Sequence, residues 1–170
     1  MINVIKNYTD LTYFQKEINE LVKNFKPTQL KGIIRNGKDV YFNEYNKEFL
    51  NTSSTLIFKI EQIIKEYYPK HFVVFRIARL NKIDLNSNVD DDFHDDLGTG
   101  NLIFLHYPVD NSHFVGGEFE WENNEIITIE NGMNLILVNN PRHRVINVSE
   151  GERYSFAFFF DIYEKKNNLI

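Results

Sequence analysis

The second half of the chain restricts the fold most strongly, because beyond Pro69 it is a series of short segments with strand character. The segments are rich in Val, Ile, Phe and Tyr, and turn-forming residues separate them. They span residues 71–80, 101–107, 117–122, 126–129, 134–139, 143–148 and 153–163. Short strands at this spacing predict a β-sandwich or a barrel.

Two helices are expected before this β-region. Apolar residues recur there at intervals of three and four, which is the period of one helix face. The first stripe consists of Leu11, Phe14, Ile18, Leu21, Val22 and Phe25, and the second of Leu56, Ile57, Ile60, Ile63, Ile64 and Tyr67. Ser53 or Ser54 is the candidate N-cap of the second helix, and Pro69 is its stop. We expect both helices to pack on one outer face of the β-structure.

The length and composition favour a single domain that occupies residues 1–170. Within it, residues 1–70 would form a helical support and residues 71–165 the β-core. Hydrophobic residues make up 42% of the chain, which is enough for a substantial core. The formal net charge of −5 argues against nucleic acid or an anionic membrane as a partner.

Several features that would direct the chain to other compartments or chemistries are missing from the sequence. The absence of cysteine excludes disulfide bonds, thiolate metal sites and a cysteine nucleophile. The longest apolar run, residues 156–160, is too short to cross a bilayer, and the first residues contain no apolar segment of signal-peptide length. We therefore expect a cytoplasmic protein with no membrane partner.

An acidic segment, residues 84–100, contains the first candidate functional residues. Segments of this length and polarity in a small domain are usually functional or mobile. Within it, His94 and Asp96 are two residues apart, so in extended backbone their side chains point the same way. With His143 as a third ligand, they would form the set of two histidines and one carboxylate that is typical of non-haem iron(II) oxygenases. The alternative is a solvated run of carboxylates that happens to include a histidine.

A second candidate site follows His143 along the chain. Arg153 and Ser155 are two residues apart in the last predicted strand and therefore share a face. A guanidinium and a hydroxyl on one face can bind a carboxylate. An arginine among the phenylalanines of this strand is costly unless an anion pairs with it. The alternative is an arginine at the strand edge that pairs with Glu152 or another local acid.

Four short motifs in the second half of the chain also form an ordered set. They are His94-x-Asp96, Gly-Gly-Glu-Phe at 116–119, His-Arg-Val at 143–145 and Gly-Glu-Arg-Tyr-Ser at 151–155. Over residues 72–160 the chain resembles the Fe(II)- and 2-oxoglutarate-dependent dioxygenases, in their prolyl 4-hydroxylase-like branch. The resemblance implies a mainly β fold with α, a double-stranded β-helix or jelly-roll, in which two facing antiparallel sheets hold a metal at one open end. The two N-terminal helices would pack on the larger sheet.

The resemblance also implies cofactors and the residues that bind them. Fe(II) would be held by His94, Asp96 and His143. Molecular oxygen and 2-oxoglutarate would be cosubstrates, with ascorbate as a stimulant. Arg153 and Ser155 would bind the distal carboxylate of 2-oxoglutarate.

Further contacts are expected around this site. Many family members carry a tyrosine in the strand after the metal loop, and the matching position here is Phe104, which we expect to be a weaker cosubstrate contact. The residues expected at the cavity mouth, as substrate contacts, are Arg79, Tyr107, Trp121 and Arg142.

The expected reaction is the hydroxylation of an unactivated C–H bond. The region of Gly116 and Gly117 resembles prolyl hydroxylases, which favours a prolyl or another residue of a protein or peptide as the substrate. The His-Arg-Val and Arg-x-Ser motifs also resemble small-molecule oxygenases of the isopenicillin-N-synthase type, so a free amino acid or small metabolite is an alternative substrate. A more remote alternative is a non-enzymatic β-sandwich that serves as a binding module.

Overall fold

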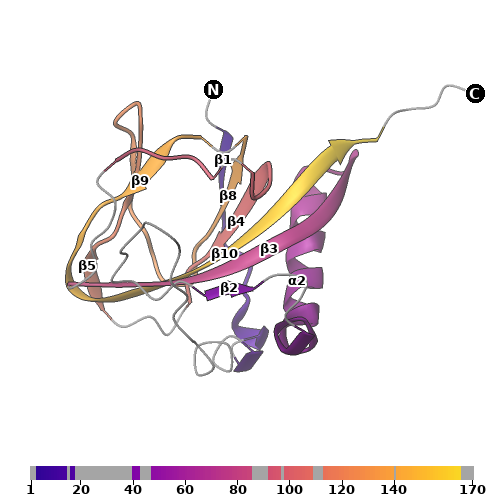
Figure 1. Ribbon diagram of the computed structural model, residues 1–170, viewed down its shortest axis with the longest axis horizontal. Coiled ribbons are helices and arrows are strands. Elements are labelled where there is room, and N and C mark those ends of the chain that lie inside the picture. The colour runs from indigo at the N-terminus through magenta and orange to yellow at the C-terminus, as the bar shows by residue number, and fades with distance from the viewer. Residues whose placement is uncertain are drawn as a thin grey trace, which may run out of the picture.

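The computed structural model describes residues 3–14, 16–17, 40–42, 47–85, 92–96, 98–108, 113–139 and 141–165. Figure 1 shows the arrangement of the elements found in these residues. In chain order they are β1 (Asn3–Asn7), η1 (Thr12–Phe14), β2 (Val40–Phe42), α2 (Lys47–Tyr67), β3 (His71–Asp84), β4 (Leu102–His106), β5 (Phe114–Gly116), β6 (Phe119–Trp121), β7 (Ile126–Ile127), β8 (Asn134–Val138), β9 (His143–Val145) and β10 (Val148–Glu164).

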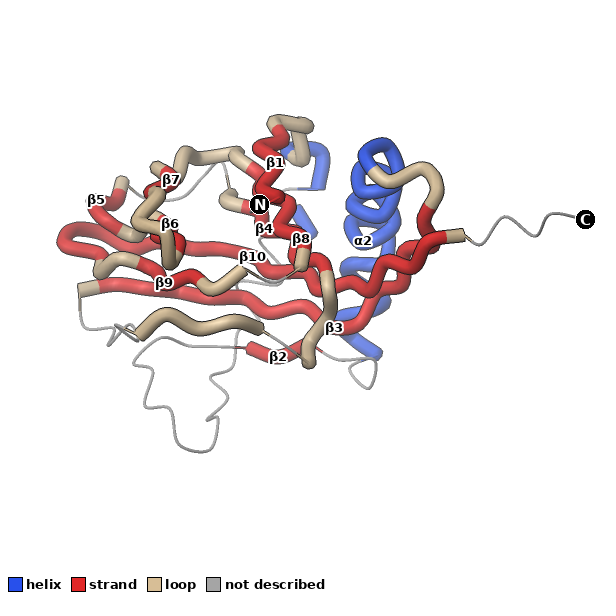
Figure 2. Tube along the Cα trace, turned by 90° about the horizontal axis from the view of Figure 1, so that it is seen from above, coloured by secondary structure: helices blue, strands red, loops and turns tan. Residues whose placement is uncertain are grey.

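The strands form two antiparallel sheets. The larger sheet has the order β1-β8-β4-β10-β3-β2, with β5 paired to β10, and the smaller has the order β7-β6-β9. Figure 2 shows β6, β7 and β9 grouped on one side of the molecule and α2 on the other. The predicted mainly β, antiparallel architecture is therefore confirmed.

A first core cluster joins the two sheets. It consists of alternate residues of β4, β8 and β10 in the larger sheet together with residues of β6 and β7 in the smaller one. Its buried members are Ile103, Leu105, Tyr107, Phe119, Trp121, Ile127, Ile129, Met133, Leu135, Leu137, Ala157 and Phe159. The interior between the sheets is thus apolar, and any polar side chain within it must find a partner there.

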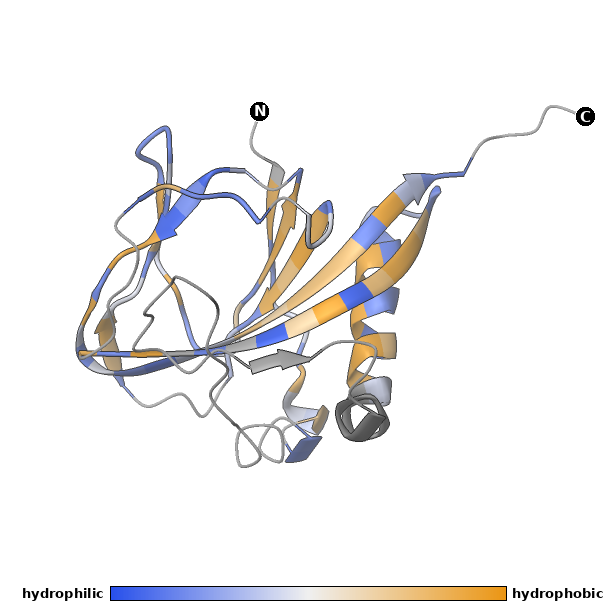
Figure 3. Ribbon diagram, viewed as in Figure 1, coloured by the Kyte–Doolittle hydropathy of each residue, from blue (hydrophilic) through white to orange (hydrophobic). Residues whose placement is uncertain are grey.

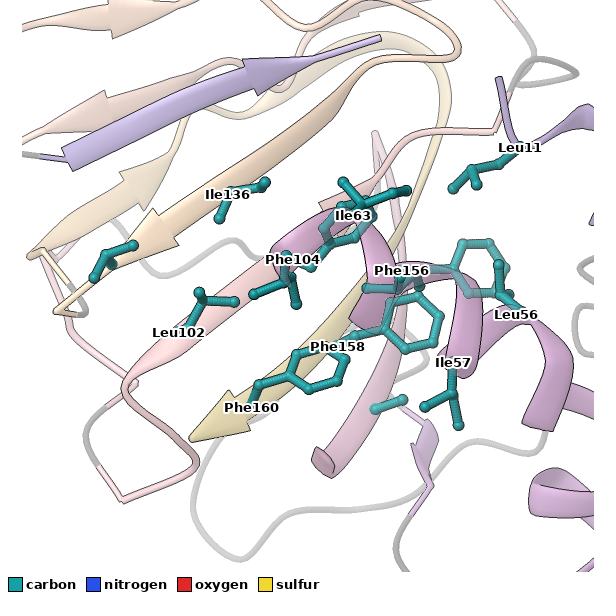
Figure 4. Close-up of a cluster of buried hydrophobic side chains, with 14 residues drawn as sticks. Leu11, Leu56, Ile57, Ile63, Leu102, Phe104, Ile136, Phe156, Phe158 and Phe160 are labelled. Carbon is teal, nitrogen blue, oxygen red and sulfur yellow. The ribbon is translucent and has the colours of Figure 1, made fainter. Parts of the chain in front are cut away.

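A second cluster lies on the other face of the larger sheet, under α2. Figure 4 shows α2 residues such as Leu56 and Ile63 against Phe104, Phe156 and Phe158 of the strands. Because successive strand residues point to opposite faces, β4 and β10 contribute to both clusters. Figure 3 shows the hydrophobic colour along β4, β8 and β10 and on the side of α2 that faces them. Burial on both faces explains why residues 156–160 form an uninterrupted apolar run.

Two of the predicted strands are longer in the structure than the sequence indicates. Strand β3 continues to Asp84 and β10 begins at Val148, because the two strands pair with each other from Glu152 opposite Asp84 to Glu164 opposite His71. Strand β1 was not predicted, and it pairs with β8 as an additional strand of the larger sheet. These segments contain polar residues, so their sequence does not indicate a strand. Pairing with the neighbouring strands stabilises the extended conformation there.

The expectation of two N-terminal helices is not confirmed. Helix α2 matches the second stripe, but it begins at Lys47 rather than at Ser53 or Ser54. Of the first stripe, the structure describes a single 3₁₀ turn at Thr12–Phe14 and helical residues 16–17, and the remainder lies outside the described residues. Within the described part of the chain, no helix is both long and apolar enough to span a membrane.

Candidate metal and anion site

The two predicted histidine ligands lie side by side, although they are far apart in the sequence. Residues His94 and His143 form an antiparallel bridge in which each backbone N–H donates to the carbonyl of the other, at 2.9 and 2.8 Å. Their ring centroids are 4.8 Å apart. The bridge therefore joins the acidic segment to the first residue of β9 and brings both imidazoles to one end of the small sheet.

The predicted carboxylate ligand lies at the same place. One oxygen of Asp96, Oδ2, is 3.9 Å from Nε2 of His143. The other oxygen, Oδ1, is 3.4 Å from Nη1 of Arg79, which extends from β3 of the larger sheet. The guanidinium of Arg79 also lies over the ring of Phe159, 5.3 Å from its centroid. The side chain predicted to contact substrate thus contacts a metal-ligand candidate.

The hydrogen bonds of the two imidazoles fix their tautomers. Nδ1 of His143 lies 2.9 Å from the carbonyl oxygen of Pro141, and Nδ1 of His94 lies 3.3 Å from that of Asp92. Because a carbonyl oxygen only accepts, both Nδ1 atoms donate, and each Nε2 keeps a lone pair. Burial lowers the pKa of His143, although the bond to Pro141 and the charge of Asp96 oppose this shift. A neutral imidazole with its outer nitrogen held by a carbonyl is the form that binds metals.

The residue types, and the tautomers of the two histidines, suit a divalent metal. The three side chains do not yet lie at bonding distance from one common point. Among the described residues, no three His, Asp or Glu side chains form a complete metal-binding group. Neighbouring ligands of an octahedral ion, with bonds of about 2.1 Å at right angles, are about 3 Å apart. A bound ion would have to draw Nε2 of His143 and Oδ2 of Asp96, now 3.9 Å apart, closer by about 1 Å.

The predicted anion ligand Arg153 is buried in the interior between the sheets. Its side chain is 1% exposed, and its guanidinium lies over the rings of Tyr107 and Phe119, 5.0 and 5.6 Å from their centroids. Nη2 donates to the hydroxyl of Tyr107 at 3.1 Å, and Nε has no hydrogen-bond partner. No carboxylate of the described residues pairs with it, and Glu152 accepts a hydrogen bond from Tyr154. A buried cation in this state requires an anion.

The loop before β6 leaves room for the side chain of Arg153. Gly117 has a φ of +75°, in the left-handed region that favours glycine. A Cβ at this position would lie 2.5 Å from Cδ of Arg153. The glycine of the Gly-Gly motif therefore has a physical role, which is to let the guanidinium lie against the backbone.

Tyr107, which lies next to this arginine, is a predicted substrate contact, and Phe104 is a predicted cosubstrate contact. The structure places Phe104 in the cluster under α2, on the opposite face of β4 from Arg153. Tyr107 lies in the cluster between the sheets and contacts Arg153 directly. Burial raises the pKa of Tyr107 to about 12, against the opposing charge and hydrogen bond of Arg153, so its hydroxyl stays protonated. Ser155 is buried two residues beyond Arg153 on the same strand.

Two further predicted residues lie near the histidines. Arg142 is exposed, and it donates to Glu122 at 2.6 Å and to the carbonyl of Phe93 at 2.8 Å. Trp121 is fully buried, pairs with His143 in register and packs 5.7 Å from its ring. Arg142 thus supports the residue before His94, and Trp121 forms a wall of the interior.

Comparisons with known proteins identify the fold. No family model and no curated protein matches this chain. A 2OG-Fe(II) oxygenase family oxidoreductase from Burkholderia pseudomallei superimposes with a TM-score of 0.69 at 14% identity, over 96% of this chain and 85% of that one. A prolyl-4-hydroxylase from Pseudomonas putida gives 0.60 at 11% identity, over 94% and 92%. A Trichoplax adhaerens prolyl hydroxylase, solved with a peptide fragment of the hypoxia inducible factor oxygen degradation domain, gives 0.60 at 14% identity, over 94% and 82%.

The chain therefore has the fold of the 2-oxoglutarate- and Fe(II)-dependent oxygenases. The resemblance seen in the sequence motifs is confirmed at the level of the fold, including its likeness to prolyl hydroxylases. The identities are too low to carry residue roles from one protein to another.

Proposed function

We propose that this protein is an Fe(II)- and 2-oxoglutarate-dependent dioxygenase that hydroxylates a C–H bond. The observation that carries the proposal is the buried guanidinium of Arg153, which no acid of the described residues neutralises. It is close to the histidines, because the ring of Phe119 contacts both: its centroid is 5.6 Å from the guanidinium of Arg153 and 5.1 Å from the ring centroid of His143. A dianion that binds a metal at one end and a cation at the other fits this arrangement.

The metal would be bound by one nitrogen from each histidine and one oxygen from Asp96. When bound, Fe(II) supplies the activation of molecular oxygen that converts 2-oxoglutarate to succinate and carbon dioxide while a substrate C–H bond becomes C–OH. The task of the polypeptide is to orient the ligands. The carbonyls of Asp92 and Pro141 hold the two imidazoles in the tautomer that can bind metal.

The distal carboxylate of 2-oxoglutarate would bind Arg153, with Tyr107 and Ser155 beside it. The fork of the guanidinium matches a carboxylate, and the two hydroxyls can donate to the same oxygens. We assign to Tyr107 the cosubstrate role that the sequence suggested for Phe104, because only the tyrosine faces Arg153. The apolar walls formed by Phe119 and Trp121 exclude water around this contact.

For the substrate, we propose a prolyl or another residue of a protein or peptide. The support comes from two structures of similar fold, one named a prolyl-4-hydroxylase and one solved with a bound peptide fragment. Incubation with Fe(II), ascorbate and 2-oxoglutarate should release more succinate when proline-containing peptides are added. Stimulation by free proline or another amino acid, and none by peptides, would instead establish a small-molecule substrate.

The cofactor assignment is tested by spectroscopy. Anaerobic addition of Fe(II) and 2-oxoglutarate should produce a visible charge-transfer band, and His94→Ala should abolish it. His113→Ala is the matched control, because His113 is exposed and lies outside the site. A folded wild-type protein that gives no band and binds no 2-oxoglutarate would contradict the proposal and favour a binding module.

A further inference from the structure

Arg79 is a cation of the larger sheet that crosses the interior to the metal-ligand candidates. It lies on β3 opposite Ala157 of β10, and the small alanine leaves room for a long side chain on this face. Its guanidinium lies over Phe159, two residues further along the same strand. Only 12% of its side chain is exposed. The arginine is thus held by packing along its length, with its charged end near Asp96.

The carboxylate of Asp96 has its two oxygens in different surroundings. Oδ1 faces Nη1 of Arg79 at 3.4 Å, and Oδ2 faces Nε2 of His143 at 3.9 Å. The side chain of Asp96 is 14% exposed, so water screens this ion pair much less than it would on the surface. The pair therefore constrains the orientation of the carboxylate.

We propose that Arg79 is a positioning residue of the metal site, which holds one oxygen of Asp96 and presents the other to the metal. The inference rests on the function proposed above. An octahedral ion held by two imidazoles and one carboxylate oxygen would keep three positions open for other ligands. A carboxylate that bound through both oxygens would remove one of them. Arg79 prevents this by occupying Oδ1.

The chemistry of arginine suits this role better than that of lysine. The planar guanidinium can stack on the ring of Phe159 while it donates to Asp96, so its direction is fixed. An ammonium group would keep the charge but lose the stacking. We therefore expect Arg79→Lys to retain part of the function and Arg79→Ala to retain little.

The test measures metal binding rather than turnover. Co(II) is titrated into the metal-free protein and followed by its visible absorption and by calorimetry. Arg79→Ala should bind Co(II) about tenfold more weakly, as is typical for loss of a group that orients a metal ligand. Arg79→Lys should fall between this variant and the wild type. Arg76→Ala is the matched control, because Arg76 pairs with Asp161 across the same two strands at 3.5 Å but lies outside the site. It should bind Co(II) like the wild type.

Each outcome has a distinct meaning. If the wild type binds no Co(II), the proposed function and this inference both fail. If the wild type binds Co(II) and a folded Arg79→Ala variant binds it equally well, the inference is overturned while the proposed function stands. If Arg79→Ala does not fold, Arg79→Lys decides: weaker Co(II) binding at an unchanged melting temperature supports the role, and wild-type affinity overturns it.

Discussion

At the scale of single residues, Gly117 offers a clean test of how the anion site is built. A methyl group there would lie 2.5 Å from Cδ of Arg153, in a backbone conformation that L-residues rarely adopt. Gly117→Ala should therefore destabilise the fold and weaken 2-oxoglutarate binding, by displacing the guanidinium. Gly98→Ala is the control, because Gly98 has a φ of +96° but no atom within 4 Å of the added Cβ.

The two glycine variants distinguish the effect of backbone strain from the effect of a steric clash with Arg153. Gly98→Ala should cost about 1–2 kcal/mol from backbone strain alone and leave 2-oxoglutarate affinity unchanged. Gly117→Ala should cost more in urea denaturation and should also lower the affinity measured by calorimetry. Equal effects of the two substitutions on both measurements would show that Gly117 does not shape the arginine site.

His106 should make the stability of the protein depend on pH. Burial lowers its pKa from 6.5 to about 4, although its hydrogen bond with Asn134, at 2.8 Å, opposes the shift. Between these two values the unfolded chain binds more protons than the folded one, so stability falls as the pH falls from 6.5 to 4. The loss reaches about 3 kcal/mol at most. Urea denaturation at several pH values should show this slope in the wild type and a shallower one in His106→Gln.

At the scale of elements, strand β9 and the residue before it support the segment that carries His94. Arg142 donates to the carbonyl of Phe93, and the guanidinium of Arg144 lies 4.8 Å from the centroid of the Phe93 ring. Arg144 is itself held by Glu120 of β6 at 2.7 Å. The small sheet thus fixes the residue before His94 through its backbone and its ring.

Removal of the backbone contact should loosen this segment. We expect Arg142→Ala to speed hydrogen exchange of the His94 amide, which donates to His143, and to weaken Co(II) binding. Exchange of amides in β4 should stay as slow as in the wild type, which controls for global destabilisation. Unchanged exchange at His94 would mean that the bridge to His143 is sufficient by itself.

The sequence predicted where most strands lie better than it predicted which side chains contact one another. Alternation with a period of two placed Arg153 and Ser155 on one face, and both are buried in the structure. Alternation cannot assign the faces of β4, because all five of its residues are buried and no polar position marks the inner face. The expectation for Phe104 comes from the family resemblance alone, and the packing of α2 places this ring on the other face of β4 from Arg153. The contact of Arg79 with Asp96 joins β3 to the segment that carries His94, and no local pattern in the sequence encodes it.

At the scale of the whole molecule, the two faces of the larger sheet have different roles: one packs against α2, and the other lines the interior that contains Arg153. The cluster under α2 contains no residue of the candidate site, whereas the cluster between the sheets surrounds Arg153 with Tyr107 and Phe119. Substitutions on the two faces of this sheet should therefore have different consequences. A cavity under α2 should reduce stability while the affinity of the folded protein for its ligands stays the same.

Ile60→Ala tests this separation. Ile60 is a fully buried residue of α2 that packs against the larger sheet, so the substitution should cost about 2–5 kcal/mol and lower the melting temperature. Co(II) with 2-oxoglutarate, at a hundred times its dissociation constant, should still add about 2.7 kcal/mol to the stability of this variant, because ligand binds only the folded state. In Arg153→Ala the added stabilisation from 2-oxoglutarate should largely disappear. A loss of ligand stabilisation in folded Ile60→Ala equal to that in Arg153→Ala would mean that the two faces of the sheet are coupled, and that α2 contributes to the geometry of the site.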